Sequence, residues 1–161
     1  MINKIESIDF ISSLQPDTHY SRSILNELYK LNKFNINIIC EKNEKNLQLK
    51  NLGNIKNVWK KGIFSQFYIL KAISKKSKII HFQHEFNMYG GSVSAILFPL
   101  MVIICKYLLK KKIVITLHAV VDHSSINNDF LKIFTSSKFL NQFSVKLFFK
   151  YIYITLCELS D

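Results

Sequence analysis

Histidine and carboxylate side chains gather in one short stretch of this sequence, IIHFQHEFNMYGG, at residues 79–91. His81, His84 and Glu85 lie within five positions of one another, and Gly90 and Gly91 follow. Residues of these types can hold a metal ion, exchange protons in catalysis, or form the polar rim where a buried strand reaches the surface. The surrounding pattern helps to distinguish these three interpretations.

The spacing argues against a metal site. The stretch reads H-x-x-H-E, whereas the zinc motifs HExxH and HxxEH place two histidines on one face of a helix. The apolar pair before His81 predicts a strand, in which His81 and His84 would point to opposite faces. We therefore expect no metal ion and no cofactor, and we expect His81 to be a structural histidine that is hydrogen-bonded to a neighbour.

Acid–base chemistry at strand ends is the second interpretation. Five ionisable residues fall at or beyond predicted strand ends: His84, Glu85, His118, Asp122 and His123. Among them His118 is the candidate catalytic residue, because the apolar strand IVITL ends there and delivers the side chain to the edge where ligands bind.

The double glycine leaves two interpretations open. Gly90 and Gly91 precede Ser92 and a predicted helix, so backbone N–H groups at a helix start can bind phosphate. A tight turn that needs glycine and binds nothing is the alternative. The sequence contains neither GxGxxG nor GxxxxGKS, so it does not predict a dinucleotide site or a P-loop.

The elements that must position these residues alternate along the chain. Apolar runs predict strands at residues 8–14, 34–40, 78–83 and 111–118, with a short one near 55–59. Helical spacing predicts helices near residues 24–31, 64–73, 93–109 and 139–156. In the last helix an apolar stripe is expected at Leu140, Phe143, Leu147, Phe148, Tyr151 and Ile152.

This alternation predicts an α/β domain with a Rossmann-like parallel sheet flanked by helices. Ligands bind beyond the carboxyl ends of such strands, which selects the loops at residues 15–21, 84–92 and 118–128. Another strand is expected after the last helix, so the sheet looks incomplete, with an exposed edge.

Composition limits the class of protein. A chain of 161 residues with 48% hydrophobic and 20% charged residues is typical of one globular domain. Cys40, Cys105 and Cys157 lie far apart in apolar surroundings, which predicts buried thiols and a reducing compartment. The first ten residues lack the pattern of a signal peptide. We therefore expect a cytoplasmic protein.

The net charge of +11 comes almost wholly from lysine. A solvated lysine-rich surface and a surface that meets anionic lipid or phosphate are both compatible with it. Residues 93–109 are strongly apolar but contain Pro99 and Lys106, and they fall short of a spanning helix, so a buried or interfacial helix is expected. A peripheral position at the inner membrane face is one expectation. Nucleic acid is not an expected partner, because the aromatic residues lie in apolar runs.

Two segments carry a resemblance to a known family. KIIHFQHEFNMYGG is similar to the strand and loop written vHvqhEfg.fgg in the N-terminal domain of GT-B glycosyltransferases of the family 4 type. KKIVITLHAVVD is similar to the vvvTlHgv strand and loop of the same domain. The resemblance covers residues 8–161, so residues 1–161 are interpreted as an incomplete acceptor-side domain without the C-terminal donor domain.

The resemblance implies a two-domain, retaining, metal-independent hexosyltransferase that uses a nucleotide-sugar donor and a glycan or lipid-linked acceptor. His118 matches the family histidine that reaches toward the donor sugar. His84 and Glu85 match the residues that face the acceptor side of the cleft, and Gly90 and Gly91 match the glycines of that loop. Asp122, in the loop after His118, is a further substrate-binding candidate.

The sequence departs from the family pattern in the first loop. QPDTHYSR contains no glycine, whereas the family loop is usually glycine-rich so that the donor phosphates can approach the backbone. His19 and Arg22 are the candidate anion-binding side chains there. The second departure from the family pattern is that residues 1–161 do not include a donor domain. We therefore expect residues 1–161 to be inactive alone.

Three functions follow from the sequence. The first is a glycosyltransferase or its N-terminal part. The second is a non-catalytic acceptor-binding module, or one subunit of a split enzyme that pairs with a separate donor-domain chain. The third, a nucleic-acid binder, rests on charge alone and is disfavoured.

Overall fold

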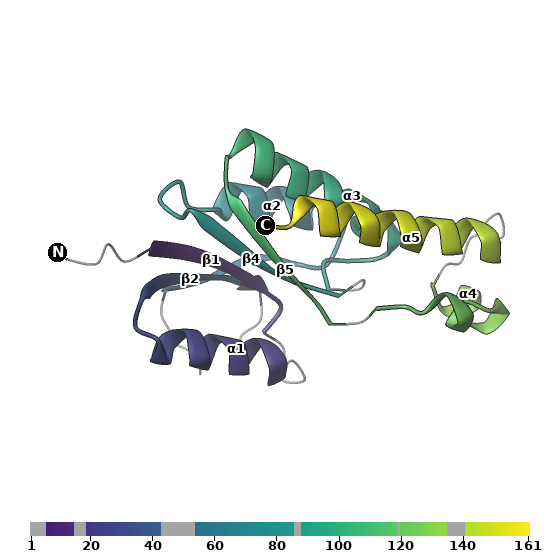
Figure 1. Cartoon of the computed structure of the whole chain (residues 1–161), viewed down its shortest axis with the longest axis horizontal. Coiled ribbons are helices and arrows are strands. Elements are labelled where there is room, and N and C mark those ends of the chain that lie inside the picture. Colours follow the sequence, from purple (N-terminus) through teal and green to yellow (C-terminus); the bar gives the residue numbers. More distant parts are fainter. Residues whose placement is uncertain (1–5, 15–18, 43–53, 86–87, 119, 135–140) are drawn as a thin grey trace.

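The computed structural model describes residues 6–14, 19–42, 54–85, 88–118, 120–134 and 141–161. In these residues five parallel strands form one sheet in the order β3-β2-β1-β4-β5 (Figure 1). The strands are β1 (Glu6–Ser12), β2 (Phe34–Glu41), β3 (Asn54–Trp59), β4 (Ile79–His84) and β5 (Lys112–Leu117). The predicted Rossmann-like parallel sheet flanked by helices is therefore confirmed.

Helices cover both faces of this sheet (Figure 1). On one face lies α1 (His19–Lys30), and on the other lie α2 (Ser65–Ala72), α3 (Ser92–Ile103) and α5 (Gln142–Leu159). A π-helix, η2 (Ile104–Leu108), continues α3, and a short 3-10 helix, η3 (His123–Ser125), follows β5. The sequence pattern did not predict the next helix, α4 (Asn128–Phe134).

Two apolar cores hold these layers together. The smaller core joins α1 to the sheet through Phe10, Leu25 and Ile38, among others. The larger core joins the opposite face to α2, α3 and α5 and includes Phe82 and Phe98. Neighbouring strand residues therefore enter different cores, which explains why the strands read as continuous apolar runs.

Helix α5 corrects the sequence interpretation of its apolar residues. The side chains that enter the core are Val145, Phe149, Ile152, Leu156 and Leu159. Most of the predicted stripe lies elsewhere: Phe143, Leu147 and Tyr151 are exposed, and Leu140 is outside the described residues. Helix α5 thus carries one buried apolar face and one exposed apolar face.

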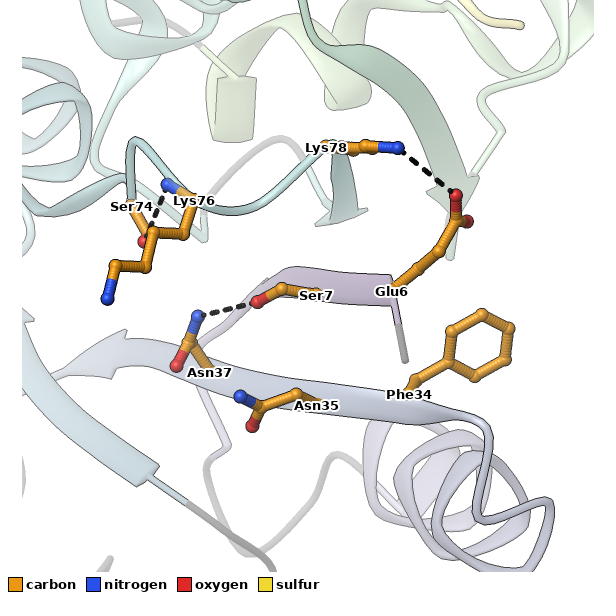
Figure 2. Close-up of a pocket in the computed structure, with 8 residues that line it drawn as sticks. All are labelled: Glu6, Ser7, Phe34, Asn35, Asn37, Ser74, Lys76 and Lys78. Atoms are coloured by element: carbon orange, nitrogen blue, oxygen red, sulfur yellow. Dashed lines mark hydrogen bonds and ion pairs between the residues drawn. The ribbon is translucent and has the colours of Figure 1, made fainter. Parts of the chain in front are cut away.

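A buried carboxylate organises the amino-terminal edge of the sheet. The side chain of Asp9 on β1 is fully buried and accepts hydrogen bonds from Asn37 Nδ2 at 2.9 Å, Ser77 Oγ at 2.6 Å and the Ser74 backbone N–H at 2.7 Å. Beside it lies a cavity of about 580 Å³, lined by Glu6, Ser7, Phe34, Asn35, Asn37, Ser74, Lys76 and Lys78 (Figure 2). This cavity is at the opposite end of the strands from the edge where parallel sheets bind ligands.

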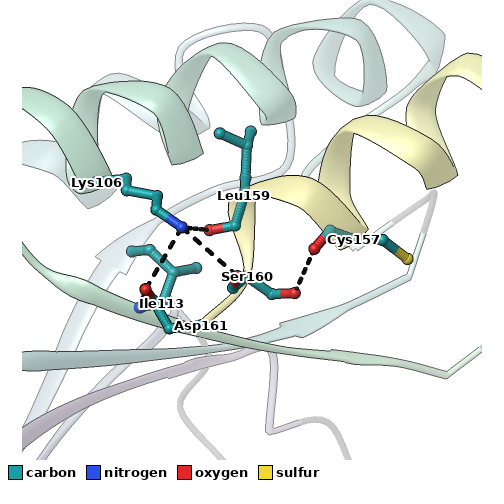
Figure 3. Close-up of polar contacts among 6 residues, drawn as sticks. All are labelled: Lys106, Ile113, Cys157, Leu159, Ser160 and Asp161. Atoms are coloured by element: carbon teal, nitrogen blue, oxygen red, sulfur yellow. Dashed lines mark hydrogen bonds and ion pairs between the residues drawn. The ribbon is translucent and has the colours of Figure 1, made fainter.

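The end of α5 is fixed to the outer edge of β5. The backbone N–H of Asp161 donates to Ile113 O at 2.8 Å, and its carboxylate accepts from Ile113 N–H at 2.8 Å. Lys106 on η2 donates to the carbonyl of Leu159 at 3.0 Å and lies 3.4 Å from the Asp161 carboxylate (Figure 3). The chain after α5 therefore reaches β5 near its amino end, where β5 forms one border of the sheet.

Two expectations from composition can be compared with the fold. Cys40 and Cys105 are buried as predicted, but Cys157 is exposed on α5, so that part of the prediction was wrong. In the described residues, every helix is too short or too polar to cross a membrane.

Candidate functional site

Four polar side chains of β4 and β5 meet near the carboxyl ends of these strands. They are His81 and Gln83 on β4, Thr116 on β5, and His118 directly after β5, and we call them the carboxyl-edge cluster. Alternation along the strands places them on the face of the sheet that carries α1. His81 confirms this placement, because its ring meets Phe10 of the α1 core edge-on at 5.0 Å.

The cluster lies beside the topological switch point of the sheet. The strand order reverses between β1 and β4, where α/β sheets bind their ligands. Helix α1 packs on β1 and β2, and its exposed Tyr20 brings its ring to 5.9 Å from the ring of His118. On the same face Val114 of β5 is 39% exposed. The cluster is therefore bordered by the start of α1 and open on its β5 side.

The amide of Gln83 fixes the proton positions of both neighbouring histidines. Its oxygen is 2.6 Å from His118 Nε2, and its nitrogen is 2.8 Å from His81 Nε2. An amide oxygen only accepts and an amide nitrogen only donates, so His118 Nε2 carries a hydrogen and His81 Nε2 accepts one. In neutral His118 the proton-accepting lone pair is then on Nδ1. This is the kind of orientation that a histidine needs to contact a substrate in one defined way.

His81 is neutral in this arrangement. Burial, followed by repulsion from His118, lowers the pKa of His81 to about 4. A neutral ring agrees with the hydrogen bond that Nε2 accepts from Gln83, and the hydroxyl of Thr116 also lies 2.8 Å from this nitrogen. The predicted structural role of His81, hydrogen-bonded to a neighbour, matches this geometry, although the ring is only partly buried.

His84 occupies a different place from the one that the sequence predicted. Its ring is 2% exposed and stacks on Phe98 at 3.9 Å between ring centres, with Tyr89 parallel at 6.0 Å. Burial, followed by repulsion from His118, lowers its pKa to about 3. Because the ring lies in the larger core, on the opposite face from His118, it does not line the ligand edge. Glu85, the next residue, is exposed at the end of β4.

Gly90 has a structural requirement for glycine. Its φ is +146°, and a Cβ at this position would lie 2.9 Å from the backbone nitrogen of Gly62. The loops after β3 and β4 also share a hydrogen bond of 3.0 Å from Gly62 N–H to Tyr89 O. Gly91 differs, because it is exposed at the start of α3 and a Cβ there would meet open space. Close packing of two loops accounts for Gly90 without any phosphate.

This contrast gives a matched pair of substitutions. We expect Gly90→Ala to lower the free energy of unfolding by roughly 1–3 kcal/mol, because the new Cβ is both strained in φ and too close to backbone. Gly91→Ala should change it by less than about 0.5 kcal/mol. Urea denaturation of both variants measures the difference, and equal stabilities would show that the two loops separate easily.

The remaining predicted site residues lie outside this cluster or outside the described side chains. Asp122 is exposed and caps η3 by accepting from Ser124, which lowers its pKa. His19 begins α1, but its side chain lies outside the described residues, as do residues 15–18 of its loop. Arg22 is half-buried on α1, and its Nε is buried without a hydrogen-bond partner among the described residues.

Sequence reasoning missed Gln83, Thr116 and Tyr20. Gln83 and Thr116 were available from the period of a strand, because each lies two residues from a histidine on the same face, His81 and His118. Tyr20 required the three-dimensional position of α1.

The cluster offers hydroxyl, amide and imidazole groups, which suit recognition of sugar hydroxyls and proton exchange. Among the described residues, no group of three or more histidine, cysteine, aspartate or glutamate side chains is placed to hold a metal ion. Comparisons of the chain with protein-family models, with curated proteins and with solved structures give no match.

Proposed function

We propose that this chain is the acceptor-side domain of a GT-B glycosyltransferase of the family 4 type. The whole enzyme would move a hexose from a nucleotide-sugar to a glycan or lipid-linked acceptor. The carbon–oxygen bond between the sugar and the diphosphate breaks, a bond to the acceptor hydroxyl forms, and the hydroxyl proton is released. The nucleotide-sugar phosphates would bind to a second domain, so we expect residues 1–161 to lack turnover alone.

The observation that carries this proposal is the locked orientation of His118 at the carboxyl edge. Gln83 holds its Nε2–H at 2.6 Å, and the ring lies next to the switch point of the sheet. Nδ1 of a neutral His118 is then the group that faces a sugar hydroxyl. Tyr20 supports the proposal, because an exposed aromatic ring beside a histidine suits the apolar face of a hexose.

Residues 1–161 give a direct test with two simple hexose probes, methyl α-glucoside and methyl α-mannoside, which carry no phosphate and so need no donor domain. Ligand-observed saturation-transfer NMR should show saturation at the hexose protons of at least one probe, and His118→Ala should remove most of that signal. His123→Ala is the matched control, since His123 is an exposed histidine on η3, and it should leave the signal unchanged. Equal signals from the two variants would contradict the assigned role of His118.

Activity supplies a second criterion. Product formation from UDP-glucose or GDP-mannose by residues 1–161 alone, at the rate of a complete enzyme, would overturn the proposal that a second domain binds the donor.

The alternative is an acceptor-binding subunit that works with a separate donor-domain chain. Its supporting observation is β5, which borders the sheet and has a partly exposed Val114. Such an edge can pair with another chain. The downstream reading frame discriminates between the two, because a continuous donor domain supports one enzyme and a separate donor-domain gene supports a split one.

A further inference from the structure

Exposed apolar side chains concentrate on one layer of the molecule. In the described residues, large exposed apolar side chains occur mainly on or next to α2, α3, η2 and α5, and the exceptions are Tyr20, Leu31, Val114 and Val120. We define the outer helical face by Phe67 and Tyr68 on α2, Ile96 and Leu100 on α3, and Leu147 and Tyr151 on α5. These helices lie side by side over the same side of the sheet (Figure 1).

The fold itself does not need these side chains. Helix α3 already buries Phe98, Met101 and Val102 against the sheet, and α5 buries Val145 and Phe149. The outer residues remain open to solvent, with Leu100 52% and Leu147 56% exposed. These side chains come from neighbouring helices, because α3 packs against both α2 and α5. Exposed apolar side chains that gather on one layer mark an interaction site.

Lysines outnumber acidic residues on the helices of this face. The elements α2, α3, η2 and α5 contain four lysines, Lys71, Lys106, Lys146 and Lys150, and one acidic residue, Glu158. Lys106 is paired with Asp161, so Lys71, Lys146 and Lys150 are the lysines that a partner would meet. Lys71 lies 4.4 Å from the centre of the Phe67 ring, and Lys150 belongs to the same exposed side of α5 as Leu147 and Tyr151. Lysine, with its apolar stem and charged end, is well suited to the boundary between apolar and anionic surroundings.

This charge pattern selects the partner. A second copy docked through the same face would bring lysines against lysines, which costs free energy. An anionic lipid surface instead attracts each lysine and accepts the apolar and aromatic side chains between its headgroups. We propose that the outer helical face docks the protein onto an anionic membrane surface, with α3 and α5 lying along it. This inference does not rest on the proposed glycosyl transfer.

Vesicle co-sedimentation of residues 1–161 tests the proposal. Vesicles of equal parts phosphatidylcholine and phosphatidylglycerol should bind the protein, and pure phosphatidylcholine vesicles should bind it much less. Raising the salt from 0.1 M to 0.5 M should weaken binding to the anionic vesicles, because it screens the lysines. The double variant K146Q/K150Q should bind about fivefold more weakly for each lysine that touches the surface.

Two leucine substitutions separate the face from the rest of the surface. The double variant L100E/L147E should bind the anionic vesicles at least roughly tenfold more weakly, because two apolar contacts become charged. Leu31→Glu is the matched control, since Leu31 is 53% exposed just after α1 on the other side of the sheet. It should bind like the original protein, and circular dichroism and thermal melting check that each variant is folded.

Three results would overturn the proposal. The first is equal binding to anionic and neutral vesicles, and the second is equal loss of binding in L31E and L100E/L147E. The third is a stable dimer that L100E/L147E dissociates, together with no vesicle binding, which would make this face an interface between copies.

Discussion

Acidification from pH 7 to pH 5 is expected to lower the free energy of unfolding by about 4 kcal/mol, half from His81 and half from His84. Burial lowers the pKa of these histidines to about 4 and about 3, from an ordinary value of 6.5. As the pH falls, the unfolded chain therefore binds protons before the folded chain does. Above pH 6.5 both rings are neutral in both states and cost nothing. The loss of stability then grows as the pH falls from 6.5 to about 4 for His81 and to about 3 for His84.

Urea denaturation at pH 7, 6 and 5 measures this loss. The pKa values of two carboxylates, Asp122 and Asp161, are lowered. Their contributions to the free energy of unfolding are lost only below about pH 4, so they do not affect the change between pH 7 and pH 5. His84→Phe removes one of the two buried imidazoles and keeps an aromatic ring against Phe98 and Tyr89. We expect this variant to retain about half of the pH dependence. A protein equally stable at pH 7 and pH 5 would show that both rings become solvated or rearrange.

The sheet could be predicted from sequence because each strand carries its own signal. Apolar runs bounded by polar or helical segments located all five strands to within two residues at each end, including the short β3. Both cores contain residues from the same apolar strands, so the sequence could not show which strand residue enters which core. Helix α4 was missed because its start depends on a cap: Asn127 Oδ1 accepts from the N–H groups of Asp129 and Phe130.

The sequence could predict where the carboxyl-edge cluster lies, but it could not predict which side chains form it. The strand ends and the parallel topology located His118 at the carboxyl edge of the sheet, and strand alternation correctly placed His81 and His84 on opposite faces. Which of those two faces carries the site depends on where α1 and α3 pack. The sequence predicted that His84 lines the ligand side, whereas packing against Phe98 placed it in the core and left His81 beside Gln83.

Helix α5 shows the same limit on a larger scale. Helical spacing identified an apolar stripe that includes Leu147 and Tyr151, but it could not tell a stripe that faces the core from one that faces outward. The helix has enough apolar residues for both. Only the position of α5 beside α3 shows that this stripe is exposed, and the membrane proposal depends on that fact.

Asp9→Ala is expected to lower the free energy of unfolding by about 3–4 kcal/mol, because it removes the buried carboxylate that three donors share as their acceptor. Asn37 Nδ2, Ser77 Oγ and the Ser74 N–H all donate to this group. Together they tie β1, β2 and the loop before β4 at the amino edge. Chemical denaturation measures the loss, and amide hydrogen exchange at Ser74 should speed up more than exchange in α1.

Asp122→Ala is the control for this substitution. Asp122 also accepts hydrogen bonds, from Ser124, but it is exposed, so solvent replaces those bonds and its substitution should change stability far less than Asp9→Ala does. Asp9→Asn should fall between the two, because the amide keeps one acceptor oxygen while its new N–H₂ group faces donors. If Asp9→Ala were as mild as Asp122→Ala, water would have to reach the carboxylate. The amino edge would then be held by Lys111, which donates to the carbonyls of Ser74 and Lys75.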